Sequence, residues 1–115
     1  MRYALLICGD EQSMLARSPE EAQAGMAEYM AFGEEMGKRG VLGGGERLRP
    51  SSTASTVQVR DGGVVIADGP FAETKEQIAG FYLIECADLD EALEVAAQIP
   101  AAAYGTIEVR PVWER

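Results

Sequence analysis

The sequence predicts a single α+β domain with an antiparallel sheet, and three observations support this. A length of 115 residues suits one domain. The chain is 47% hydrophobic and 25% charged, which is the balance of an ordinary globular protein able to bury its own core. Short apolar runs alternate along the chain with two segments that carry helix-start and helix-stop signals.

The first part of the chain indicates a strand followed by a long helix. Residues 2–8 form a short apolar run that is typical of a strand, and Gly9-Asp10-Glu11 ends it. A helix is expected to run to about Arg39, because Ser18 can cap it and Glu21 completes a capping box. Its apolar stripe is expected at Ala22, Met26, Tyr29, Met30, Gly33, Met36 and Gly37, with Gly33 and Gly37 allowing close approach to a sheet.

The middle of the chain is rich in glycine and turn residues. Residues 41–48 are a second strand candidate, in which Gly43-Gly44-Gly45 indicates a bulge or a close approach of another group. A hairpin is expected from two runs, 55–60 and 64–67, that flank Asp61-Gly62-Gly63. The segment 68–71, Asp-Gly-Pro-Phe, is a turn by composition.

The last part indicates a strand, a helix and a final strand. Residues 80–86 are a strong strand candidate. Asp88 can cap a helix that extends to about Ile99, and Glu91 closes a second capping box. Residues 106–114 alternate as a strand does.

The resulting order is that of a ferredoxin-like βαββαβ fold with an inserted β-hairpin and two helices on one face of the sheet. A sheet covered on one face should have strands that alternate between apolar and polar residues. The runs 3–8 and 81–84 are instead apolar on both faces. We therefore expect a second sheet on the open face, which a homodimer would supply.

Charge and residue usage exclude several classes of function. The formal net charge is −9 without an obvious basic stripe, which argues against a nucleic-acid partner and against anionic membranes. Histidine is absent, so the commonest acid–base group and metal ligand are missing, and we expect neither a metal nor a cofactor. No secretory signal or membrane-length apolar run is present, so a cytoplasmic location is expected. Cys8 and Cys86 are expected as free thiols, although the strand order leaves a disulfide open.

Asp68 is the candidate catalytic residue. A carboxylate at a strand end beside a Gly-Pro turn can be held at the mouth of a cleft, and partial burial against Phe71 would raise its pKa into an acid–base range. The alternative is that Asp68 only shapes the turn. Arg47 is a candidate for binding a ligand carboxylate or phenolate, or it pairs with an acidic residue of the chain. Pro70, Phe71 and Tyr82 would surround the ligand.

Three segments together resemble the DGPF-type branch of the YCII-related family, and the resemblance covers essentially the whole chain. They are the segment 68–82, the Ser18-Pro-Glu-Glu helix start and the ending 105–112. The resemblance implies a ferredoxin-like fold and a dimeric α/β barrel. Relatives with an enzymatic look carry a histidine–aspartate pair, whose places fall near Tyr29 and Lys38 here, so their chemistry does not transfer.

Two hypotheses about function follow, and the sequence does not decide whether the protein is an enzyme. In the first, each half of a dimeric barrel binds a small organic molecule, and Asp68 performs proton transfer or elimination on it, or the ligand is bound without being transformed. In the second, the domain is a non-catalytic regulatory or protein-binding module. The resemblance adds an extracytoplasmic-function sigma factor as a partner for that module.

Overall fold

Four strands form an antiparallel sheet in the order β2-β5-β1-β6 in the computed structural model, which describes residues 1–114. The strands are β1 (Arg2–Gly9), β2 (Leu42–Arg47), β5 (Gln77–Glu85) and β6 (Thr106–Pro111). Each neighbouring pair is antiparallel. The predicted α+β class and antiparallel sheet are confirmed, and the strand order is compatible with a ferredoxin-like arrangement.

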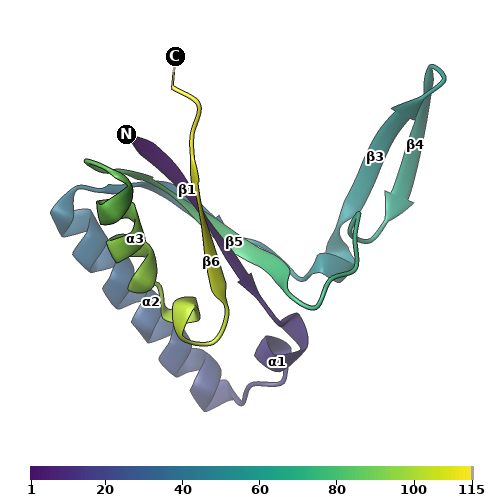
Figure 1. Cartoon of the computed structure of the whole chain (residues 1–115). Coiled ribbons are helices and arrows are strands. Elements are labelled where there is room, and N and C mark those ends of the chain that lie inside the picture. The colour runs from purple at the N-terminus through teal and green to yellow at the C-terminus, as the bar shows by residue number, and fades with distance from the viewer. Residues whose placement is uncertain (115) are drawn as a thin grey trace.

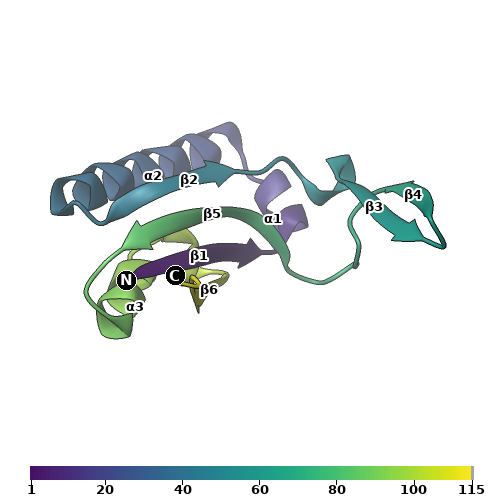
Figure 2. The same ribbon diagram turned by 90° about the horizontal axis from the view of Figure 1, so that it is seen from above.

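Two helices, α2 (Pro19–Arg39) and α3 (Leu89–Ala97), lie on one face of this sheet (Figure 1). The core is the layer between them. Tyr3, Leu5 and Ile7 of β1 are buried there, and they pack in one cluster with Met36 of α2 and Val95 of α3. Because side chains alternate along a strand, Ala4, Leu6 and Cys8 point to the opposite face, which no helix of residues 1–114 covers (Figure 2).

Local capping chemistry explains where α2 begins and ends. The Ser18 hydroxyl accepts a hydrogen bond from the Glu21 amide at 3.1 Å, and the Glu21 carboxylate accepts one from the Ser18 amide at 3.2 Å. Gly40 ends the helix in the left-handed conformation, with φ +72°. The predicted capping box and the predicted glycine stop are both confirmed.

The predicted apolar stripe of α2 is only partly right. Met36 is buried, but Met26 and Met30 are 57% and 70% exposed, and the stripe omitted the buried Phe32. Gly33 does not allow close packing either, since a Cβ added there, or at Gly37, would meet nothing within 4 Å. The buried face of the helix is centred on Tyr29, Phe32 and Met36, so the predicted stripe shares only Tyr29 and Met36 with it.

The glycine run in β2 does bring two strands close together. The register between β2 and β5 shifts between Leu42 and Gly44, which is the predicted bulge. A Cβ on Gly45 would lie 2.6 Å from the Phe81 carbonyl oxygen and 2.7 Å from the Tyr82 ring. Only a residue without a side chain fits between the strands at this position.

Three short elements complete the chain, namely α1 (Glu11–Leu15) and the 3-10 helices η1 (Ser51–Thr53) and η2 (Pro100–Ala103). Helix α1 was not predicted, because Gly9-Asp10-Glu11 was interpreted only as the end of a strand. Asp10 is in fact its N-cap, with a side chain that accepts a hydrogen bond from the Gln12 amide at 3.0 Å.

Strands β3 (Ser55–Arg60) and β4 (Gly63–Asp68) form a separate two-stranded sheet that extends away from the rest of the molecule (Figure 1). This hairpin lies on the side of the four-stranded sheet that faces away from α2 and α3. It makes the chain expanded: the radius of gyration is 16.1 Å, whereas about 13 Å is typical of a compact domain of this length.

The two cysteines lie at opposite ends of the β1–β5 ladder. Cys8 pairs with Ile78, whereas Cys86 follows Glu85, the partner of Arg2. Six residues of strand separate these ends by about 20 Å, which excludes a disulfide within one chain. Of the helices among residues 1–114, none is long and apolar enough to cross a membrane.

Candidate functional site

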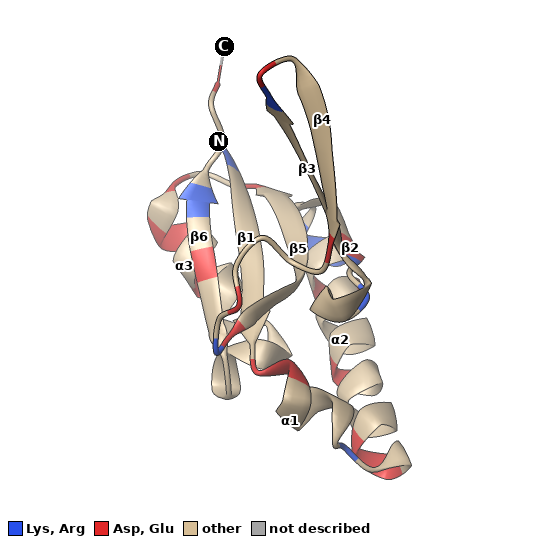
Figure 3. Ribbon diagram, turned by 90° about the vertical axis from the view of Figure 1, so that its right-hand side faces the viewer, with Lys and Arg blue, Asp and Glu red and all other residues tan. Residues whose placement is uncertain are grey.

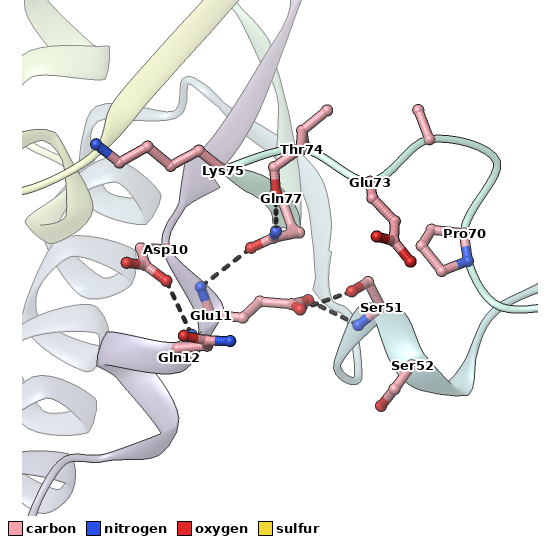
Figure 4. A pocket seen from close by; sticks show the side chains of 11 residues that line it. Asp10, Glu11, Gln12, Ser51, Ser52, Pro70, Glu73, Thr74, Lys75 and Gln77 are labelled. Atoms are coloured by element: carbon pink, nitrogen blue, oxygen red, sulfur yellow. Dashed lines mark hydrogen bonds between the residues drawn. The ribbon is translucent and has the colours of Figure 1, made fainter.

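A cavity of about 450 Å³ lies where the hairpin joins the body of the molecule (Figure 4). Its walls come from three parts of the chain: the junction of β1 and α1, the 3-10 helix η1, and the segment 70–77 that leads into β5. The charged side chains around it are Asp10, Glu11, Glu73 and Lys75. It is therefore a polar site with three carboxylates and one amine.

Glu11 holds the three walls together. Its carboxylate accepts hydrogen bonds from the Ser51 amide at 2.7 Å and from the Ser51 hydroxyl at 2.6 Å. Its own amide donates to the Gln77 side-chain oxygen at 3.1 Å. One residue thus links the start of α1 to η1 and to the start of β5.

The other carboxylates differ in how they are engaged. Asp10 accepts hydrogen bonds from the Gln12 amide at 3.0 Å and the Ser13 hydroxyl at 3.2 Å, so its orientation is set by the cap. Glu73 and Lys75 are exposed at the rim and form no ion pair within residues 1–114. Figure 4 shows the Glu73 side chain directed towards Pro70 and Ser51. These two rim side chains are free to meet a ligand.

The turn before β5 is stiffened by its own side chains. The Thr74 hydroxyl donates a hydrogen bond to the Glu76 carbonyl oxygen, and the Gln77 side-chain amide donates to the Thr74 carbonyl oxygen. At the other end of the segment, the Gly69 amide donates to the Ala54 carbonyl oxygen at 2.7 Å, which closes the base of the hairpin. The wall formed by 70–77 is therefore tied at both ends.

Of the five predicted site residues, only Pro70 lines this cavity. Asp68 ends β4 opposite Ser55 and is exposed, and Phe71 is 83% exposed. The burial of Asp68 against Phe71 that the catalytic hypothesis assumed does not occur within this single chain. The roles proposed for both residues stay predictions.

Arg47 and Tyr82 lie elsewhere, on β2 and β5. Arg47 is exposed and pairs with Gly80, two residues from Tyr82. Tyr82 is half-buried on the helix side of the sheet, with its ring centroid 5.1 Å from that of Phe32. The structure does not bring these residues to the cavity, and their ligand-binding roles also stay predictions.

Tyr29 of α2 and Tyr82 of β5 cannot act as bases near neutral pH. Burial raises the pKa of Tyr29 to about 12, and the neighbouring phenols of Tyr104 and Tyr82 add to the shift. Burial also raises the pKa of Tyr82. Both phenols therefore remain protonated and can only donate or accept hydrogen bonds.

The two thiols are poor nucleophiles for a related reason. Burial raises the pKa of Cys8, and the carboxylates of Glu108 and Glu76 raise it further. Burial is also the main cause of the raised pKa of Cys86. Within residues 1–114 there is no group of three or more Cys, Asp or Glu side chains that would hold a metal ion.

Sequence reasoning missed Glu11 and Ser51, the pair that fixes the cavity. They are forty residues apart, and neither belongs to a recognisable motif. Only the Asp10 cap, read as the start of a helix rather than as the end of a strand, would have drawn attention to Glu11.

Comparison with known proteins finds a matching family and a similar protein. A match to the YCII-related domain spans residues 1–115. An uncharacterised protein of Rhizobium meliloti (strain 1021) is 44% identical over 114 residues, which cover 97% of this chain and 92% of that protein. The cavity and the hairpin both lie inside the matched region.

Proposed function

The chain belongs to the YCII-related family, and from that premise we propose that it binds a small organic molecule in the cavity between α1, η1 and the segment 70–77. The cavity carries this proposal. Its volume of about 450 Å³ falls in the range of ordinary ligand sites, which is roughly 300–1,000 Å³. The Glu11–Ser51 hydrogen bonds preorganise its walls.

The charges around the cavity favour a ligand that donates hydrogen bonds. Asp10 and Glu11 already accept bonds from the protein, so Glu73 is the carboxylate most open to a ligand amine or hydroxyl. The Lys75 ammonium group is a hydrogen-bond donor, so it would bind a ligand carboxylate or another acceptor. An amino acid or a small hydroxy acid combines both features.

Acid–base chemistry by Asp68 is the finer part of the proposal. Asp68 is followed by Gly69, which has φ +91°, and by Pro70 in the cavity wall. A ligand that reaches out of the cavity past Pro70 would meet the Asp68 carboxylate, and the exposed Phe71 would cover it. Proton transfer on the bound ligand is then the reaction class. Arg47 would contribute only from a second copy, and Tyr82, which packs on Phe32 on the helix side of the sheet, has no part in this proposal.

The protein is also proposed to act as a homodimer, in the manner of a dimeric α/β barrel. Leu6 of β1 and Phe81 of β5 are directly paired on the uncovered face of the sheet, and Ala4 and Leu83 are paired beside them. This is the pattern that requires a second layer. The alternative function, a regulatory module for a sigma factor, would use exposed surface instead. The observation in its favour is that the β3–β4 hairpin exposes valine and isoleucine side chains.

A ligand screen with matched variants tests the cavity proposal. We would record thermal shifts of the wild-type protein with a set of amino acids, small amines and hydroxy acids, then measure affinities of the hits by calorimetry. Glu73→Gln and Lys75→Met should each weaken binding at least tenfold. Lys38→Met is the control, because Lys38 is an exposed lysine of α2 that pairs with Glu34 and lies away from the cavity.

The outcomes separate the parts of the proposal. Hits that bind the two cavity variants as tightly as the wild type would show that the ligand site is elsewhere. If a ligand binds in the cavity, Asp68→Asn should abolish any turnover while changing its affinity less than threefold. Unchanged turnover in this variant would leave Asp68 as a turn residue.

A further inference from the structure

We propose that the β3–β4 hairpin is an arm that packs its apolar face on a second copy of this chain. The inference rests on the proposed homodimer and adds a second contact surface to it. Neither the cavity nor the uncovered sheet face requires this arm, so its role can be tested separately.

The two faces of the hairpin differ sharply in chemistry. Val57 lies opposite Ile66 and Val59 lies opposite Val64, so four β-branched residues share one face. Their side chains are between 61% and 69% exposed. The other face has Thr56, Gln58 and Arg60 along β3, and it carries only one large apolar side chain, Val65 of β4, beside Ala67. Along the arm, charged residues are confined to its tip and its base (Figure 3).

This apolar face is as large as patches that are often functional on monomeric proteins. Four such side chains expose on the order of 400 Å² of apolar surface, which is comparable to the largest patch on a typical monomer. An isolated two-stranded hairpin is also marginally stable by itself. Both arguments favour another surface against the arm, because in the single chain its four apolar side chains remain mostly exposed.

A second copy is the occupant that the geometry favours. The arm extends on the same side of the molecule as the uncovered sheet face (Figures 1 and 3). A copy placed on that face with twofold symmetry therefore meets the arm as well, and its own arm reaches back in the same way. Such an isologous contact covers the arm and the sheet face of both copies, and it forms a closed dimer rather than a filament.

The areas agree with a stable dimer. Each chain would bury its own arm face and an equal area that receives the arm of its partner, roughly 800 Å² in all before the sheet face is counted. That is about what one partner contributes to a standard protein–protein interface. The two arm contacts alone therefore reach the size of a standard interface, and the sheet face adds to it.

The arm also has few charges that would oppose such a contact. Each copy carries a net charge of −9, and two copies repel one another over the range that salt does not screen. The four Val and Ile residues place no charge at the contact itself, and the only carboxylate on their face is Asp68 at the base of the arm.

The test compares two lysine pairs on opposite faces of the same hairpin. Val57→Lys with Ile66→Lys places two charges on the apolar face, and Gln58→Lys with Val65→Lys places the same cross-strand pair on the other face. Sedimentation equilibrium of the full-length protein should show a dimer dissociation constant at least a hundredfold higher for the first pair. The second pair should stay within fivefold of the wild type.

A variant with a shortened arm provides a second test. Because most of the hairpin is removed, a weakened dimer of this variant cannot result from misfolding of the hairpin. Residues 57–66 are replaced by Asn-Gly, which forms a tight turn between the paired Thr56 and Ala67. Its thermal unfolding measured as a monomer should match that of the wild-type monomer, and its dimer should be weakened at least as much as by the lysines on the apolar face.

Each outcome has a defined meaning. A wild-type dimer that neither the lysine pair on the apolar face nor the shortened arm weakens would overturn the arm proposal, and the sheet-face dimer would survive. A monomeric wild-type protein would overturn both. The cavity proposal is judged by ligand binding and stands or falls independently of both results.

Discussion

The Glu11–Ser51 contact is the part of the site with the most direct physical consequence. We predict that these two residues are energetically coupled, because one carboxylate accepts both the amide and the hydroxyl hydrogen bond of Ser51. The perturbation is a double-mutant cycle with Glu11→Ala and Ser51→Ala. Ser52→Ala serves as the control, because the neighbouring Ser52 is exposed.

The expected magnitudes follow from which bonds each variant removes. A hydrogen bond to a charged group contributes about 1.5–3 kcal/mol, and the lower end applies because both residues are half-exposed. Ser51→Ala loses only the hydroxyl bond, about 1.5 kcal/mol. Glu11→Ala loses both, about 3 kcal/mol, and the double variant loses no more than that. The coupling energy is therefore about 1.5 kcal/mol.

Urea unfolding followed by circular dichroism measures the free energy of unfolding for each variant. Additivity of Glu11→Ala and Ser51→Ala to within about 0.5 kcal/mol would refute the reasoning, since residues in one hydrogen-bond network should not behave independently. The Glu11/Ser52 cycle should be additive to that precision. A coupled Ser52 would mean that Glu11 acts through the general stability of η1 rather than through these two bonds.

Two further predictions concern stability outside the cavity. Met36→Ala should destabilise the protein by about 2–5 kcal/mol in urea unfolding, because Met36 is 0% exposed. Met30→Ala is the control and should change the free energy of unfolding by less than about 0.5 kcal/mol. Equal effects of the two substitutions would mean that the core lies elsewhere. The second concerns alkaline pH. The pKa of Tyr29 is raised to about 12 from an ordinary 10.0. The contribution of its protonated phenol to the free energy of unfolding is therefore complete below pH 10 and is lost as the pH rises to about 12. Half-exposure limits this contribution to about 1 kcal/mol. Between pH 9 and pH 11.5 the wild type should lose that much more stability than Tyr29→Phe, and parallel losses would contradict the shift.

Features encoded by neighbouring residues were predictable from the sequence. The capping box at Ser18 and Glu21 needs only residues three apart, so its chemistry appears directly in the sequence. The close approach at Gly45 was also predictable, because a glycine inside a strand usually marks a bulge or a place where another backbone comes near. Strand and helix boundaries followed from these local signals to within a few residues.

Features that depend on distant residues were not predictable in this way. The α2 stripe illustrates the limit, since periodicity identifies an apolar face but does not say how far along the helix other elements extend to cover it. Asp10 illustrates a second limit of local sequence signals, because an Asp after a strand can end that strand and cap a helix at the same time. The site itself depends on Glu11 meeting Ser51, and only the tertiary fold brings them together.

The apolar residues on the uncovered sheet face and the exposed hairpin lie on the same side of the molecule. The two helices cover one face of the sheet, yet the sequence makes β1 apolar on both faces, so half of its apolar surface lies outside the core. The hairpin leaves the body between β2 and β5 on that same side. Its base is held by Glu11 through η1 and by the Gly69–Ala54 hydrogen bond. The cavity therefore lies at the hinge of the arm, and a second copy that holds the arm would also fix the wall formed by segment 70–77. Ligand binding and association of two copies are then expected to favour one another, because each stabilises the same segment.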